Sequence, residues 1–147
     1  MSKKNLEKYV DLLEQLPKNN LLDDVIDLGE LGRIYTADDD ELSEKEKRYR
    51  DTSNANDKAK TEYLSNLTDE EFYFLYNAFD LGKSYYTNKD SLQKEINHFG
   101  GENELIEKNL ENIKKVHPTK KIGIEQITGK QDWLVIESLK GYLEKFR

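Results

Sequence analysis

The chain contains no cysteine among its 147 residues. This absence excludes disulfide bonds, thiolate metal ligands and cysteine nucleophiles, and it fits a reducing compartment. No apolar run approaches the ~20 residues that a helix needs to span a bilayer. The N-terminal stretch MSKKNLEKYVDLLEQL alternates charged with apolar residues, unlike the continuous apolar segment of a signal peptide. We therefore expect a cytoplasmic protein that does not bind membranes.

Sequence motifs for catalysis and cofactor binding are also missing. There is no phosphate-binding loop, and Gly100-Gly101 lacks the preceding strand and the spacing of a dinucleotide-binding turn. His98 and His117 do not form a helical metal-ligand pair, and the run from Asp38 to Glu41 lacks the alternating ligands and central glycine of a calcium loop. We expect a protein that is not an enzyme and has no cofactor or metal site.

Charged side chains make up 36% of the chain and hydrophobic ones 35%. Nine Tyr, five Phe and one Trp still supply large apolar surfaces for a globular core. The net charge is −7 and it is unevenly spread: residues 1–100 carry 14 basic and 22 acidic side chains, whereas residues 101–147 carry 9 and 8. This imbalance opposes non-specific binding to nucleic acid and favours a partner with a basic surface.

The N-terminal part of the chain predicts two helices followed by a charged connector. Leu6, Tyr9 and Leu13 recur at helical spacing before Pro17, which predicts an amphipathic helix over residues 4–16. Asn20 is expected to cap a second helix, so that residues 1–36 form a helical hairpin. Residues 37–66 are poor in apolar side chains. A capping box of Ser43 with Glu46 favours a solvated helix there, and a mobile linker is the alternative.

Residues 67–147 are predicted to form a helical core. Thr68 and Glu71 make a second capping box before a strongly amphipathic helix, which Gly82 is expected to end. The apolar face of this helix consists of Phe72, Leu75, Tyr76 and Phe79. A helix from Thr87 to the Gly100-Gly101 pair follows, and then a helix over residues 102–116, which ends at His117-Pro118.

The stretch IGIEQITGKQDWLVI, residues 122–136, places two apolar runs on either side of a glycine-containing turn. Ile122 and Ile124 alternate with polar or small residues, which predicts a β-hairpin over residues 120–136, although Ile124 and Ile127 could also share one face of a helix. The predicted fold is therefore mainly α with a small β-hairpin. The order of elements resembles a winged helix-turn-helix, with residues 102–116 as the recognition helix, but Ile96 and Asn109 fit that pattern badly.

The leading hypothesis is a small acidic, non-catalytic regulator or inhibitor of another protein, of the immunity or anti-defence type. Its carboxylates would contact a basic surface, such as that of a protein that handles nucleic acid, where they can stand in for phosphates. Tyrosines would add contacts, because Tyr is enriched among interface hot spots. The predicted binding residues are Asp38, Asp39, Asp40, Glu41, Glu44, Glu46, Tyr85 and Tyr86. The simpler alternative is a solvated acidic loop, with tyrosines that seal the core.

The winged-helix resemblance implies a second hypothesis, a DNA-binding transcriptional or replication regulator that acts as a homodimer. Its backbone contacts would come from a lysine cluster, while Asn103, Glu104 and Lys108 would face the groove. The lysine cluster consists of Lys114, Lys115, Lys120, Lys121 and Lys130. The carboxylates of Glu102, Glu104, Glu107 and Glu111 on the same helix oppose duplex binding. The lysines could instead only keep this end of the molecule soluble.

Overall fold

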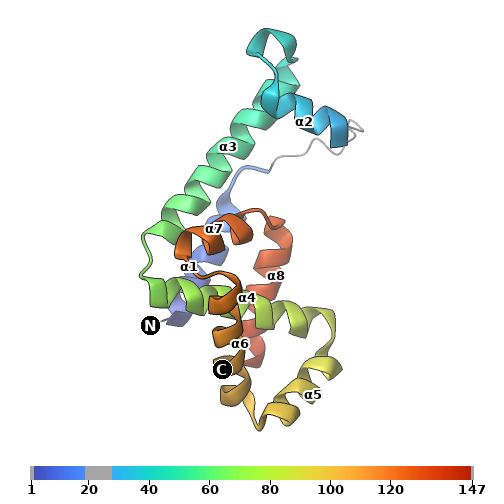
Figure 1. Cartoon of the computed structure of the whole chain (residues 1–147). Coiled ribbons are helices and arrows are strands. Elements are labelled where there is room, and N and C mark those ends of the chain that lie inside the picture. The colour runs from blue at the N-terminus through green and yellow to red at the C-terminus, as the bar shows by residue number, and fades with distance from the viewer. Residues whose placement is uncertain (1, 19–27, 147) are drawn as a thin grey trace. The chain divides into compact units, whose positions relative to one another are not determined.

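The computed structural model describes residues 2–18 and 28–146, and within these ranges it contains eight α-helices, one short 3-10 helix and no strand (Figure 1). The helices are α1 (Ser2–Gln15), α2 (Leu28–Thr36), η2 (Asp39–Glu41), α3 (Glu44–Ser65), α4 (Asp69–Thr87), α5 (Lys89–Phe99), α6 (Glu102–Val116), α7 (Lys120–Thr128) and α8 (Asp132–Lys145). The prediction of a mainly α protein is confirmed. The predicted helix start at Asn20 lies outside the described residues. Within the described ranges, no helix is long and apolar enough to cross a membrane.

Two compact units make up the chain: residues 1–15 with 60–147, and residues 16–59. We refer to them as the first and the second unit. α3 contributes its residues up to Ala59 to the second unit and its last turns, from Lys60 onward, to the first. The boundaries predicted near residues 36 and 66 were placed where the apolar content of the sequence changes. They stay a prediction.

α4 is the central helix of the first unit and contacts α1, α5, α6, α7 and α8. Its start is the predicted capping box: the Glu71 N–H donates to the Thr68 hydroxyl at 3.1 Å, and the Thr68 N–H donates to the Glu71 carboxylate at 2.9 Å. Phe72, Leu75 and Phe79 are buried, as the apolar periodicity predicts. α1 adds a buried face of Leu6, Tyr9, Val10 and Leu13.

The prediction that Gly82 ends this helix is wrong, because α4 continues to Thr87. Gly82 instead lies where α4 crosses α8. A Cβ atom built there would overlap the carbonyl oxygen of Ser138 and lie 2.6 Å from its carbonyl carbon. Glycine is therefore required for the close approach of two helix backbones, not for a turn. Tyr85 and Tyr86 therefore lie in the last turns of α4, and Asn88 rather than Thr87 caps α5.

The β-hairpin predicted over residues 120–136 is also wrong, and with it the winged-helix resemblance. Thr119 caps α7, since its hydroxyl accepts from the N–H of Ile122 at 3.3 Å. Ile124 and Ile127 are both buried on one face, as the helical alternative requires. Gly129 has φ −76°, whereas a two-residue hairpin turn needs a left-handed residue. Residues 129–131 connect α7 to α8, and they do not form a β-turn between two strands.

The second half of the same stretch begins α8. Its buried residues Val135, Leu139 and Tyr142 are spaced by four and three, which is a helical period that extends well beyond the four-residue apolar run. Trp133, by contrast, is 52% exposed. The strand prediction rested on a run too short to show this period.

A pair of amide side chains, buried Asn77 and half-buried Asn109, holds α6 against α4. Asn77 donates from Nδ2 to the carbonyl oxygen of Ile106 at 3.0 Å. Asn109 donates to Asn77 Oδ1 at 2.7 Å and to Asp80 Oδ2 at 2.9 Å. The polar side chain of Asn109, which fits the winged-helix pattern badly, is thus satisfied by α4 and fixes the position of α6 on it.

Candidate functional site

The six predicted acidic residues lie in the second unit, on η2, on the segment around it and on the first turn of α3. We call Asp38, Asp39, Asp40, Glu41, Glu44 and Glu46 the acidic strip. Its end on α3 is fixed by the predicted capping box: the Glu46 N–H donates to Ser43 Oγ at 3.1 Å, and the Ser43 N–H donates to Glu46 Oε1 at 3.0 Å. The capping box thus turns the Glu46 carboxylate back toward the start of the helix.

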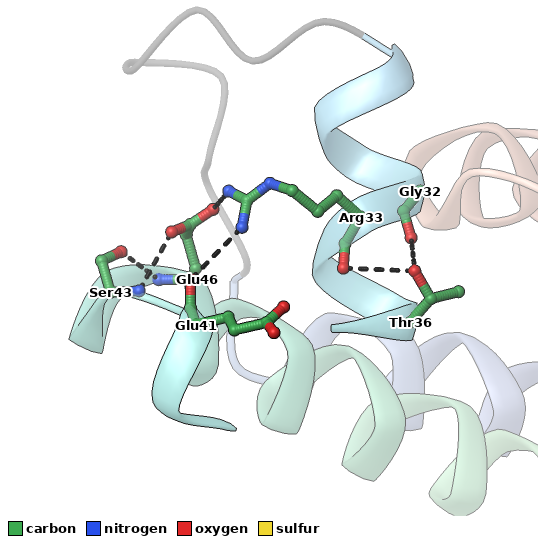
Figure 2. Close-up of polar contacts among 6 residues, drawn as sticks. All are labelled: Gly32, Arg33, Thr36, Glu41, Ser43 and Glu46. Carbon is green, nitrogen blue, oxygen red and sulfur yellow. Dashed lines mark hydrogen bonds and ion pairs between the residues drawn. The ribbon is translucent and has the colours of Figure 1, made fainter. Parts of the chain in front are cut away.

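Arg33 ties this end of the strip to α2, as Figure 2 shows. Its guanidinium pairs with the Glu46 carboxylate and also donates to the carbonyl oxygen of Glu41 at 3.4 Å. The pKa of Glu46 is lowered, first by the backbone hydrogen bond from Ser43 and further by the charge of Arg33. Glu46 is therefore a positioning residue: it joins α2, the loop after η2 and α3, and its charge is already neutralised within the unit.

A second arginine neutralises the middle of the strip. Arg50 on α3 donates to Asp39 at 2.6 Å and approaches Asp51 at 3.3 Å. The hydrogen bond to Asp39 is the main cause of the raised pKa of Arg50. Glu44 has a weaker partner, Lys47, at 3.5 Å and one turn along the same helix. The two arginines thus hold η2 and α2 against α3 and occupy Asp39 and Glu46.

Three carboxylates of the strip remain outward and unpaired. Asp38, Asp40 and Glu41 are exposed, and within residues 2–18 and 28–146 none of their side chains makes a hydrogen bond or an ion pair. In Figure 2 the Glu41 carboxylate points away from the Arg33 guanidinium. The second unit carries seven basic and twelve acidic side chains, a net charge of −5, against −2 for the first unit with sixteen and eighteen. Most of the excess negative charge therefore belongs to the unit that carries the strip.

Tyr85 and Tyr86 belong to the first unit, so the predicted binding residues fall in two units. Tyr85 is half-buried: its ring lies 4.9 Å from Lys89 Nζ, and its hydroxyl donates to Glu144 at 3.4 Å. It serves internal packing. Tyr86 is 52% exposed and lies edge-on to the ring of Trp133, with ring centroids 6.4 Å apart. Sequence reasoning missed Trp133 because it placed this residue in a strand.

Two of the five lysines of the DNA-binding hypothesis, Lys114 and Lys120, make contacts within the fold, whereas Lys115 is exposed and Lys130 half-buried. Lys120 Nζ donates to the carbonyl oxygens of Ser65, at 2.7 Å, and of Leu67, and so caps the end of α3. Lys114 lies 5.7 Å from the ring centre of Tyr73. Lys121, with Ile124 and Thr128 among others, lines a surface groove of about 390 Å³ between α3 and α7. The helix predicted over residues 102–116 forms as α6, but the wing predicted over residues 120–136 does not, because those residues belong to α7 and α8.

The chemistry open to these surfaces is ion pairing and aromatic contact. Within the described part of the chain, no group of three or more His, Cys, Asp or Glu side chains is placed to hold a metal ion. Comparison of the chain with protein-family models, with curated proteins and with solved structures found no match.

Proposed function

We propose that the chain is a non-catalytic regulator or inhibitor that acts in the cytoplasm by binding a basic surface of a partner protein through the acidic strip. The observation that carries this proposal is that some carboxylates of the strip are paired within the unit and others are not. Asp39 and Glu46 pair with Arg50 and Arg33, while Asp38, Asp40 and Glu41 stay exposed and unpaired. Carboxylates held on an ordered scaffold lose little conformational freedom when they meet a cationic partner.

The partner class follows from charge. A net charge of −5 on the 44 residues of the second unit speeds encounter with a positive surface and repels polyanions. Proteins that handle nucleic acid present such surfaces, and carboxylates can occupy the positions of phosphates there. A regulator of the immunity or anti-defence type, which blocks a nucleic-acid-handling protein, is the form of this function that we favour.

The first experiment identifies the partner. Tagged protein is used to capture partners from a cell lysate with and without nuclease, and stoichiometric partners are identified by mass spectrometry. We expect a protein partner that survives nuclease treatment. Partners that are lost with the nucleic acid would contradict the proposal.

The second experiment tests the strip. We compare a variant with Asp38→Asn, Asp40→Asn and Glu41→Gln with a matched control that neutralises three exposed carboxylates of the first unit. The control substitutions are Glu7→Gln, Asp11→Asn and Glu107→Gln. Loss of three interfacial charges should weaken binding about tenfold or more and flatten its salt dependence. Equal weakening by both variants would show that only net charge matters, and would remove the strip as the contact.

A further inference from the structure

The first unit carries an exposed aromatic pair that its own fold leaves open. Trp133 and Tyr86 are each 52% exposed, and their rings meet at an interplanar angle of 62°. Trp133 Nε1 donates to Gln131 Oε1 at 2.6 Å, which fixes the direction of the indole. The packing of α8 on α4 brings the two rings together (Figure 1). An indole that is both exposed and held in place is preorganised for contact.

Aromatic rings in this unit already attract cations. Lys89 lies over the ring of Tyr85 and Lys114 over that of Tyr73. Among the described residues no cation lies over Trp133 or Tyr86. This holds although Lys130 precedes Trp133 by three positions and Lys83 precedes Tyr86 by three. Indole is the strongest cation–π partner among the side chains. Trp133, the aromatic side chain of this unit that should bind a cation most strongly, is thus without a cation among the described residues.

An exposed carboxylate, that of Glu137, lies one helical turn after Trp133. Glu137 follows Trp133 by four residues in α8, so the two side chains are neighbours on one helix face. Glu137 is exposed and makes no ion pair within the described residues. The nearby ammonium of Lys140 is bonded to Glu14 at 2.9 Å, and Asp132 is bonded to Lys60. The hydrogen bond to Glu14 is the main cause of the raised pKa of Lys140, and Glu137 adds to it through its charge. Glu14 holds the ammonium, so the Glu137 carboxylate has no ion-pair partner among the described residues.

We propose that Trp133, Tyr86 and Glu137 form a binding site for an arginine side chain of a partner protein. A guanidinium is planar and weakly hydrated, so it can lie on the indole and donate to a carboxylate at the same time. A lysine ammonium is a compact, strongly hydrated charge, so it makes the two contacts together less well. This inference rests on the proposed function in one respect, that the partner is basic. The site itself lies in the first unit, whereas the acidic strip lies in the second.

The single Trp of the chain makes the site its own reporter. The probe is a capped peptide, Gly-Arg-Gly-Arg-Gly-Arg-Gly, and its counterpart has lysine in place of arginine. Each is titrated into the full chain at physiological salt while the emission of Trp133 is recorded. We expect a saturable change with the arginine peptide and about threefold weaker apparent affinity for the lysine peptide. Identical curves for the two peptides, or no change in emission, would overturn the proposal.

Four variants locate the response. Tyr86→Ala and Glu137→Gln should each weaken the arginine peptide about two- to fivefold. Glu107→Gln on α6 makes the same change of charge and should leave the titration unchanged. The triple strip variant should also leave it unchanged, which separates failure of this site from failure of the proposed function. If Glu137→Gln behaves like Glu107→Gln, the peptide responds to overall charge and the site does not exist.

Discussion

Replacing Gly82 by alanine tests the helix crossing that brings Tyr86 next to Trp133. At this crossing a Cβ on Gly82 would overlap the carbonyl oxygen of Ser138 and lie 2.6 Å from its carbonyl carbon. Because non-bonded carbons rest about 3.5–4.0 Å apart, the contact with the carbonyl carbon alone would require α8 to retreat by about 1 Å, and the overlap with the oxygen requires more. No side-chain rotation relieves the contact, since the obstructing atoms belong to the backbone of α8.

The expected loss of stability combines two opposing effects. Overpacking typically costs about 1–3 kcal/mol, and a backbone obstruction belongs at the upper end of that range. Alanine is about 1 kcal/mol better than glycine inside a helix, which offsets part of the cost. We therefore expect Gly82→Ala to lower the free energy of unfolding by about 2 kcal/mol. That change corresponds to a Tm about 6 °C lower for a chain of this size.

Unfolding followed by Trp133 emission reports on the first unit, because the chain has no other Trp. Gly32→Ala in α2 is the matched control: nothing lies within 4 Å of a Cβ there, so circular dichroism should show a gain of up to about 1 kcal/mol. Gly141→Ala should fall between the two, since its nearest neighbour, a ring carbon of Tyr85, is 3.2 Å away. A wild-type midpoint for Gly82→Ala would refute the close crossing.

Two further predictions concern buried and capping charges. Lys60 is 5% exposed and bonds to the Thr128 carbonyl oxygen and the Asp132 carboxylate, so Lys60→Met should cost about 1.5 kcal/mol in urea unfolding. An unchanged midpoint would show that the ion pair adds nothing. The pKa values of Glu46 and Glu71 lie below 4.5, chiefly because of backbone hydrogen bonds from the capping residues. Their stabilisation is therefore present above pH 4.5 and lost as the pH falls through the folded-state values. Glu71→Gln should show a smaller loss of stability on acidification than wild type, as measured by unfolding at stepwise lower pH.

Features specified by a few neighbouring residues were predictable from the sequence. Both capping boxes form as predicted, because a Ser or Thr and a Glu three residues later satisfy each other's N–H groups whatever surrounds them. The helix predicted over residues 102–116 has those bounds, and Gly100 adopts the left-handed conformation, φ 93°, that ends α5. Local chemistry decides these positions, so tertiary packing has little to override.

Features decided by distant residues were not predictable. Whether Gly82 ends a helix or permits a crossing depends on Ser138, which lies 56 positions along the chain. Gly123 is similar: a Cβ there would meet the ring of Phe72 at 2.6 Å, so α7 needs glycine for packing and not for strand geometry. In the stretch predicted as a hairpin, each glycine was interpreted from its neighbours in sequence alone. That interpretation fails wherever the constraint is a close approach in space.

At the candidate site, too, the sequence alone does not show which charges distant residues neutralise. Composition predicts an acidic segment, but it cannot say which carboxylates are available, because Glu46 is paired by an arginine 13 residues earlier and Asp39 by one 11 residues later. These two pairs consume two of the seven cations of the second unit and leave Asp38, Asp40 and Glu41 without partners among the described residues. The paired carboxylates hold this surface rigid. The unpaired carboxylates remain available to bind a partner. The outward carboxylates are thus the ones whose loss should weaken binding while the unit stays folded, whereas loss of Arg33 or Arg50 should act through the scaffold that presents them.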